Sequence, residues 1–164
     1  MINITKRTVR HAALLIGGMI IFQAKAQEMS QNHPQLRLPT VELIAGMHLI
    51  QAEVAQTHRE HSTGLMYRRT MGVNEGMLFI YEKPQVRCYW MRNTLIPLTV
   101  AFIDQDGTIV NLKDMQPLDE RSHCSIKPVR YALEMNQGWF EQRGIRPGFK
   151  LRGIAAAPAG LAAP

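Results

Sequence analysis

The chain has 164 residues, a formal net charge of +6 and two cysteines. This length is sufficient for one domain with a hydrophobic core of its own. The positive charge does not predict nucleic-acid binding, because the Lys and Arg residues are not clustered as a phosphate-binding face requires.

The first 26 residues have the pattern of an export signal. A basic segment with Lys6, Arg7 and Arg10 precedes an apolar run of 11 residues, and an Ala-Lys-Ala cleavage pattern ends at Ala26. The apolar run is shorter than the roughly 20 residues that span a membrane. We therefore expect cleavage after Ala26, contact with the membrane only during export, and a mature protein that is periplasmic or secreted. An uncleaved N-terminal anchor is the alternative.

Removal of this signal changes the charge of the protein. Four of the 19 Lys and Arg residues lie within the signal, whereas all 13 acidic residues follow it. Fifteen basic residues then face 13 acidic ones, so the predicted mature protein has a net charge of +2.

The two cysteines, Cys88 and Cys124, both lie in the predicted mature part. Exported chains with two cysteines most often pair them, so we expect a disulfide. Closing a loop of about 37 residues would stabilise the fold by roughly 4 kcal/mol in the chain-entropy model. Two free thiols and a metal-binding pair are the alternatives.

The chain after the signal begins with polar residues and then changes period. Residues 27–39 contain two prolines and predict a disordered lead-in. Two alternating runs within residues 40–55 predict a hairpin. Thr57, with Glu60 three residues later, forms a capping box that predicts a short helix ending near Gly64.

The rest of the chain is rich in strand patterns. We expect strands at residues 75–82, 86–91, 99–103, 108–113, 129–135 and 148–154. Residues 104–107 predict a turn, and residues 114–127 predict a long loop. Asn136 is expected to cap a brief helix, and residues 155–164 predict a disordered, low-complexity tail. The pattern as a whole predicts one mostly β domain over residues 40–154, with one or two short helices, arranged as a two-sheet sandwich or a closed barrel.

Six motifs in this domain resemble a known family in their order and spacing. They are GLMYR (64–68), EGMLFIY (75–81), YWMRNTLIPL (89–98), FIDQDGTIVNL (102–112), YALEMNQGWF (131–140) and GIRPGFKL (144–151). Together they resemble the domain of unknown function 192 family, over about residues 40–152. The resemblance implies a compact, jelly-roll-like β-sandwich in an often exported protein, without a settled activity. This chain has Thr99 and Phe149 at two positions where the family often has Asp.

The segment after Cys88 carries the candidate binding site. Arg92 offers a planar fork of donors for a carboxylate or phosphate, and Trp90 offers a flat apolar face. Asn93 and Thr94 add short polar groups, so the segment predicts a concave site for a small polar or anionic ligand or a peptide end. In the alternative interpretation Asn93 and Thr94 satisfy backbone groups in a tight turn.

Glu134 lies between apolar neighbours in YALEM and is a second-tier site residue, together with Tyr131. A buried carboxylate needs a cationic or hydrogen-bonding partner, so we expect Glu134 to pair with Arg92 or to contact the ligand. A catalytic acid or base with a shifted pKa is the less favoured alternative.

Two further kinds of chemistry have weaker support in the sequence. His58 and His61 are three residues apart on the predicted helix and would need His48 or Glu53 to complete a metal site. Methionines favour Cu(I), but here they fall in apolar runs where core packing explains them. A Gly-x-Ser-x-Gly nucleophile motif is absent from the sequence.

The leading interpretation is an exported, non-enzymatic module that binds a small polar ligand. It has no predicted cofactor, catalytic residue, metal ligand or nucleic-acid partner. An envelope enzyme or a copper-handling protein is the alternative, and the sequence makes no prediction of oligomeric state.

Overall fold

The computed structural model describes residues 33–156. The predicted signal and residues 157–164 of the predicted tail lie outside the described residues. The strands are β1 (Thr40–Ala45), β2 (His48–Ala55), β3 (Glu75–Gln85), β4 (Cys88–Tyr89), β5 (Leu98–Ile103), β6 (Ile109–Met115), β7 (His123–Cys124) and β8 (Val129–Asn136). The helices are α2 (His58–Thr63) and two 3-10 turns, η1 (Glu141–Arg143) and η2 (Ile154–Ala156).

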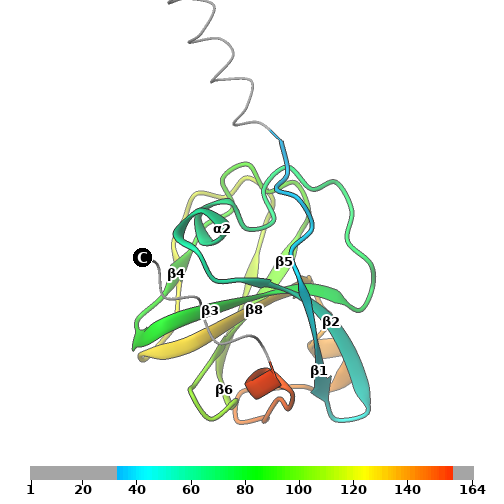
Figure 1. Ribbon diagram of the computed structural model, residues 1–164, viewed down its shortest axis with the longest axis vertical. Helices are drawn as coiled ribbons and strands as arrows, with labels where there is room; N and C mark the ends of the chain where they lie inside the picture. Colours follow the sequence, from blue (N-terminus) through cyan, green and yellow to red (C-terminus); the bar gives the residue numbers. More distant parts are fainter. Residues whose placement is uncertain (1–32, 157–164) are drawn as a thin grey trace, which may run out of the picture. The chain divides into compact units, whose positions relative to one another are not determined.

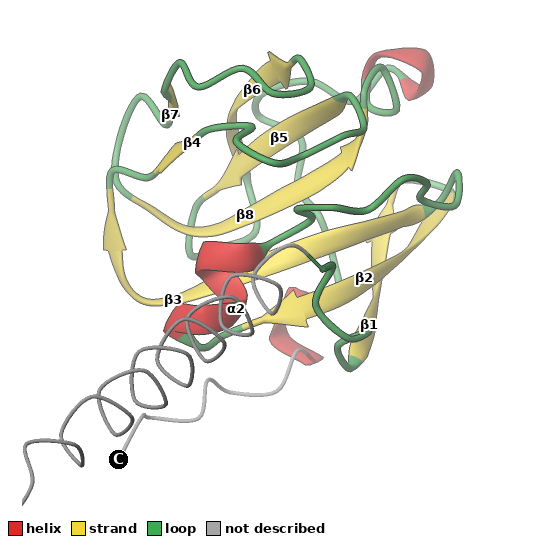
Figure 2. Ribbon diagram, turned by 90° about the horizontal axis from the view of Figure 1, so that it is seen from above, coloured by secondary structure: helices red, strands yellow, loops and turns green. Residues whose placement is uncertain are grey.

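Six strands form one mixed sheet in the order β1-β2-β3-β8-β5-β6 (Figure 1). β2 and β3 are parallel, and the other neighbours in this sheet are antiparallel. β4 and β7 form a separate antiparallel pair, in which Cys88 lies opposite Cys124. The helix α2 packs against β3 (Figure 2), since the ring of His61 lies 4.7 Å from the ring of Tyr81.

Both faces of the six-stranded sheet are covered by apolar side chains. Successive side chains of β8 point to opposite faces of the sheet, since Ala132 belongs to one core cluster and Leu133 to the other. All six residues of β5 are buried, as expected for a strand with both faces covered. The face that carries Ala132, Met77 and Val100 packs beneath α2 and the segment around β4.

The prediction of a mostly β domain with a short helix is confirmed. The finer expectation, a jelly-roll-like sandwich or a closed barrel, is not what the pairing shows over residues 33–156, which form the mixed sheet and the separate pair. Isolated bridges do connect both edge strands to the C-terminal segment, from Ile44 to Arg152 and from Thr108, just before β6, to Lys150. The last strand expected at residues 148–154 is not formed: two isolated bridges stand in its place, and η2 begins at Ile154.

The hairpin and the capped helix are confirmed. β1 and β2 form this hairpin, in which Ala45 and His48 are the paired residues nearest the turn. Gly46 in the turn has a positive φ of 66°, which glycine adopts easily. Thr57 Oγ1 accepts from the amide of Glu60, and the Glu60 carboxylate accepts from the amide of Thr57. The helix ends at Gly64, as predicted.

Three local predictions were wrong in detail. β3 continues to Gln85, three residues beyond the end expected at Glu82. The strand expected at residues 86–91 is reduced to Cys88–Tyr89. Asn136 does not cap a helix. Its side-chain Nδ2 donates to the carbonyl of Gly72 at 2.9 Å, and η1 has no side-chain cap.

Glu53 is buried on β2, and two arginines hold its carboxylate. Arg68 Nη2 donates to Oε2 at 2.7 Å, and Arg37 Nη1 donates to Oε1 at 3.0 Å. Burial alone would raise the pKa of Glu53. Hydrogen bonds from Arg68 and from the Leu38 amide, together with the charges of Arg68 and Arg37, lower this pKa below its usual value. Arg37 and Leu38 thereby attach the described part of the predicted lead-in to the domain.

Cys88 and Cys124 form a disulfide that joins β4 to β7, as predicted. Such a bond indicates an oxidising compartment. Within residues 33–156, no helix is long and apolar enough to span a bilayer.

Candidate functional site

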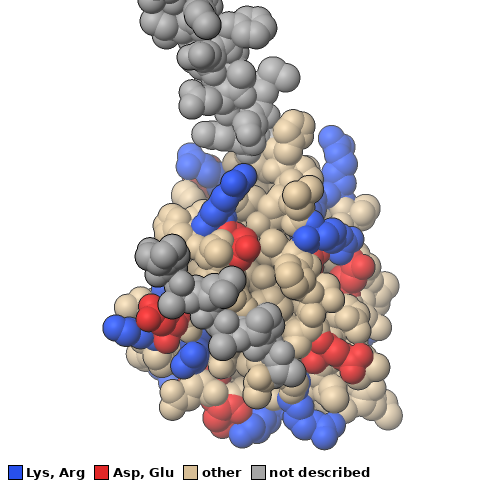
Figure 3. Space-filling model, in the orientation of Figure 1, with Lys and Arg blue, Asp and Glu red and all other residues tan. Residues whose placement is uncertain are grey.

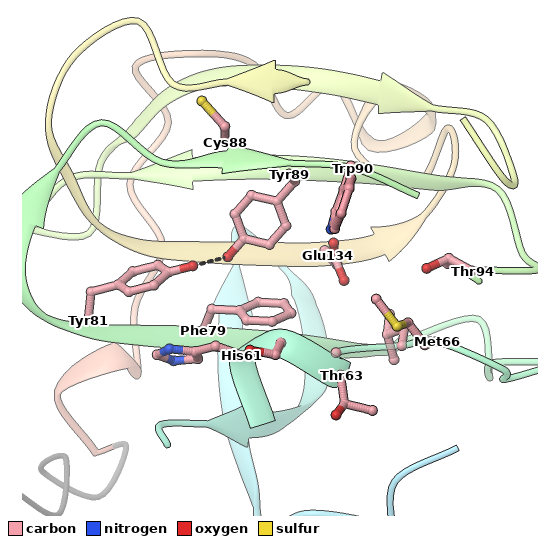
Figure 4. A pocket seen from close by; sticks show the side chains of 13 residues that line it. His61, Thr63, Met66, Phe79, Tyr81, Cys88, Tyr89, Trp90, Thr94 and Glu134 are labelled. Atoms are coloured by element: carbon pink, nitrogen blue, oxygen red, sulfur yellow. Dashed lines mark hydrogen bonds between the residues drawn. The ribbon is translucent and has the colours of Figure 1, made fainter. Parts of the chain in front are cut away.

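A cavity of about 110 Å³ lies between α2, β3, β4 and β8. Figure 4 shows the side chains that surround it. Its lining consists of an acid, a histidine, four aromatic rings and small or apolar residues: Glu134, His61, Phe79, Tyr81, Tyr89, Trp90, Ser62, Thr63, Gly64, Leu65, Met66, Cys88 and Thr94. Segments that are far apart in the sequence therefore build one site.

Glu134 is the acidic residue of this cavity. It lies on the apolar face of β8, beside Met77 on β3 and Val100 on β5, and is only 5% exposed. Within the described part of the chain, no side chain or amide donates a hydrogen bond to its carboxyl group or forms an ion pair with it. Because burial disfavours the charged form, the pKa of Glu134 rises to about 8. Glu134 is thus mainly a neutral acid at pH 7.

Two tyrosines form the polar end of the cavity. The hydroxyls of Tyr81 and Tyr89 are 2.6 Å apart and share a hydrogen bond (Figure 4). The ring of Tyr89 stands edge-on against Phe79 at a centroid distance of 5.1 Å. Desolvation raises the pKa of both tyrosines, so both hydroxyls stay neutral at physiological pH.

His61 is the one histidine that lines the cavity, but one of its ring nitrogens is used elsewhere. Nε2 lies 3.0 Å from the carbonyl oxygen of Ala55, which favours a proton on this nitrogen. Desolvation lowers the pKa of His61, although the backbone carbonyls around it oppose this effect. His61 therefore contributes a neutral ring to the wall of the cavity.

Three of the predicted site residues, Trp90, Thr94 and Glu134, line the cavity together. In Figure 4 the indole nitrogen of Trp90 and the carboxyl group of Glu134 point toward each other. Trp90 is 46% exposed and stands at the rim, whereas Thr94 is buried. These three residues therefore share one cavity with apolar side chains, and their role in binding stays a prediction.

Arg92 and Asn93 are not among the residues that line this cavity. Arg92 forms an exposed ion pair with Glu120 at 3.4 Å, and its guanidinium lies 5.1 Å from the ring centroid of Trp90. The expected Arg92–Glu134 pair is therefore not formed. Asn93 adopts a positive φ of 59°, and its main-chain carbonyl accepts from the amide of Tyr67.

Tyr131 also lies away from the cavity. Residues 131 and 134 are an odd number apart on the strand β8, so their side chains point to opposite faces. Tyr131 packs against the core cluster on the other face. The polar cluster of Tyr131 and Glu134 considered from the sequence is excluded by this geometry.

The metal site considered from the sequence is not assembled. Among residues 33–156, no group of three or more His, Cys, Asp and Glu side chains is placed to hold a metal ion. Glu53 instead holds Arg68 and Arg37, and His61 bonds to the backbone.

A second cavity, of about 410 Å³, lies around Thr99, Asp114 and Phe140. It is larger, but several of its polar groups are already satisfied. The Thr99 hydroxyl donates to Asp114 Oδ1 at 2.6 Å and accepts from the amide of Gly138 at 3.2 Å. We therefore regard the smaller cavity, with its unpartnered carboxyl group, as the functional site.

The sequence alone did not identify the residues from α2 and β3 as part of the site. Phe79 and Tyr81 stand in an apolar strand pattern, and His61 was considered only as a metal ligand. The capping box was the one local signal near them, since it fixes where α2 begins. Their meeting with Glu134 depends on the pairing of β3 with β8.

Comparisons with known proteins agree with the described architecture. The sequence profile of DUF192, described as "Uncharacterized ACR, COG1430", matches residues 41–153. The comparison with curated proteins finds no match.

Two similar crystal structures are each 35% identical in sequence and cover 73% of this chain. One, from Sinorhizobium meliloti 1021, is described as "a putative transcription regulator" and has a TM-score of 0.68 over 97% of its own length. The other, from Novosphingobium aromaticivorans DSM 12444, is described as a protein of unknown function and has a TM-score of 0.69 over 89% of its length.

Proposed function

The chain belongs to the DUF192 family, and we propose that this member is an exported module that binds a small polar ligand in the cavity above Glu134. The carboxyl group of Glu134 carries this proposal, because it is buried, aimed into a cavity and unpartnered among the described residues. A carboxyl group that faces a cavity and has no protein partner keeps its hydrogen-bonding capacity for a ligand. Functional sites are the usual place for such groups.

The location of the protein is part of this proposal. The disulfide between Cys88 and Cys124 fits an oxidising compartment, and the N-terminal sequence has the pattern of an export signal. On the face in Figure 3, Lys and Arg residues alternate with Asp and Glu residues. This mixture favours a small ligand over a nucleic acid, which would need clustered positive charge.

A thermal-shift screen of the oxidised protein against sugars, amines, carboxylates, nucleotides and metal ions tests the proposal. A ligand at about 100 times its Kd should stabilise the fold by roughly 2.7 kcal/mol. The stabilisation should be lost in Trp90→Ala, which removes the rim of the cavity. It should persist in Val73→Ala, a matched control, because Val73 is exposed and lies outside the cavity. A screen without any stabilising compound, or with equal shifts in both variants, would contradict the proposal.

An enzyme is the second candidate, and the raised pKa of Glu134 favours it. A carboxylic acid with a pKa of about 8 could donate a proton at neutral pH. In that case a compound found in the screen would be converted by the wild type and left unchanged by Glu134→Gln. Binding without conversion would favour the module.

A further inference from the structure

We propose that the cavity receives the ammonium group of a small organic cation, with the carboxylate of Glu134 as its counter-ion. This inference rests on the proposed function and adds the charge and size of the ligand. It departs from the anionic ligand that the position of Arg92 in the sequence suggested.

The charged and titratable residues that line the cavity favour a cation. Glu134 is its acidic residue and His61 its basic one, and His61 is neutral with Nε2 bonded to Ala55. Arg92, the group expected to bind an anion, lies outside the lining and pairs with Glu120. An anion would therefore find no positive charge among the residues that line the cavity, whereas an ammonium group would find a carboxyl group with free acceptor oxygens.

The aromatic lining suits the same group. The rings of Phe79, Tyr81, Tyr89 and Trp90 line the same cavity as Glu134. Ring faces attract ammonium groups, and pockets for such groups commonly combine several aromatic rings. The volume of about 110 Å³ is somewhat smaller than the roughly 150 Å³ of an engineered protein cavity that binds benzene. It therefore fits a small alkylammonium head, with any longer tail leaving past the exposed edge of Trp90.

The binding step moves one proton. Free Glu134 is mainly protonated at pH 7, so forming the ion pair requires that its carboxyl group release a proton to solvent as the ammonium group enters. Because the pKa of Glu134 is about 8, the affinity should rise about ninefold from pH 6 to pH 7 and about fivefold from pH 7 to pH 8, and then level off. A primary amine should bind more weakly again above its own pKa of about 10, because it then loses its charge.

The other titratable groups around Glu134 have pKa values that are shifted away from the range between pH 7 and pH 8. The pKa of His61 on α2 is lowered, and the pKa values of Tyr81 on β3 and Tyr89 on β4 are raised. Desolvation is the largest cause of each of these shifts. The guanidinium of Arg87 stacks on the ring of Tyr81 at 3.7 Å. The strand neighbours Met77 and Val100 carry no charge. A change in affinity between pH 7 and 8 therefore reports on Glu134.

An NMR titration with propylammonium, tetramethylammonium, propanol and propionate, at pH values from 6 to 9, tests the inference. The indole N–H of Trp90 is the reporter at the cavity. That of Trp139 is an internal control, because it donates to Asn74 at 3.1 Å and belongs to the other core cluster. We expect both ammonium ions to shift the Trp90 signal, with an affinity that rises steeply from pH 6 to pH 8 and levels off above it. The neutral and anionic probes should leave the signal unchanged.

Glu134→Gln is the matched variant, since it keeps the size and polarity of the side chain but cannot carry charge. It should fold and lose at least tenfold in affinity for propylammonium at pH 8. Propionate binding that weakens as pH rises would overturn the inference of a cation and leave the binding module standing. The inference is also overturned if neither ammonium ion shifts Trp90, and the compound screen then decides separately whether the cavity binds any ligand.

Discussion

Glu134 occupies a strand position that would otherwise suit an apolar side chain. Its neighbours on the same face, such as Met77, Val100 and Ala132, are all buried in one core cluster. In the free protein the carboxyl group can stay there because it is protonated, and a neutral acid costs far less to bury than a charged one. The same position makes it sensitive to any ligand that changes its charge.

The raised pKa of Glu134 predicts that the protein loses stability as pH rises. The pKa is near 4.5 in the unfolded chain and about 8 in the fold, so the folded state binds more protons between these values. The stabilising effect is complete below about pH 4.5 and is lost as pH rises through 8. Between pH 6 and pH 8 the free energy of unfolding should fall by about 2 kcal/mol from this group.

Urea denaturation at both pH values measures this loss, with Glu134→Gln as the control. His61, whose lowered pKa acts in the opposite direction, is present in both proteins and cancels in their difference. If the wild type and Glu134→Gln lose stability in parallel, the carboxyl group is not protonated in the fold and our description of its burial is wrong.

The helix α2 is only six residues long, yet it supplies one side of the site. His61, Ser62 and Thr63 line the cavity, and the chain leaves the helix through Gly64, whose φ is 47°. A Cβ atom at Gly64 would lie 3.3 Å from the ring of Phe79, so close packing and backbone conformation both favour glycine there. A helix this short depends on its cap and on its packing for stability.

Thr57→Ala removes the side-chain half of the capping box and should lower the free energy of unfolding by about 1 kcal/mol. Thr57→Ser keeps the acceptor oxygen and should remain close to the wild type. Chemical denaturation measures the difference, and hydrogen exchange at the amide of Glu60 locates it, because that amide donates to Thr57 Oγ1 at 3.2 Å. Equal stability of the Ala and Ser variants would mean that packing alone holds α2.

At the scale of the whole molecule, the disulfide holds the short β4–β7 pair, which lies outside the main sheet. β4 is only two residues long, so its hydrogen bonds alone give little support. Tyr89 belongs to this strand, Trp90 follows it directly, and Cys88 itself lines the cavity. The covalent bond therefore connects the stability of the fold to the shape of the site.

Replacing both cysteines by serine should lower the free energy of unfolding by about 4 kcal/mol, as expected for a loop of this length. The double variant should also bind the ligand of the wild type more weakly, because Tyr89 and Trp90 lose their anchor. Urea denaturation with and without reductant provides the measurement, and reductant should leave the double variant unchanged. If reductant does not destabilise the wild type, the two sulfurs are not bonded in solution.

Local patterns in the sequence determined much of this protein. The capping box fixed the start of α2, alternation identified the hairpin and β8, and the spacing of six motifs identified the family. These features depend on neighbouring residues in the chain, so their physical causes can be read from the sequence. Trp90, Thr94 and Glu134 were singled out in the same way, from polar groups beside apolar ones.

Only the tertiary structure decided which groups meet. The pairing of β3 with β8, and the packing of α2 and β4 over that face, bring Phe79, Tyr81 and His61 to Glu134, whereas strand parity turns Tyr131 away. Arg92 lies at the surface, where it pairs with Glu120 and not with Glu134. The pKa of a group also depends on its surroundings in the fold. The sequence could therefore identify the carboxyl group of Glu134 but not its protonation state, which is determined by its burial without a partner.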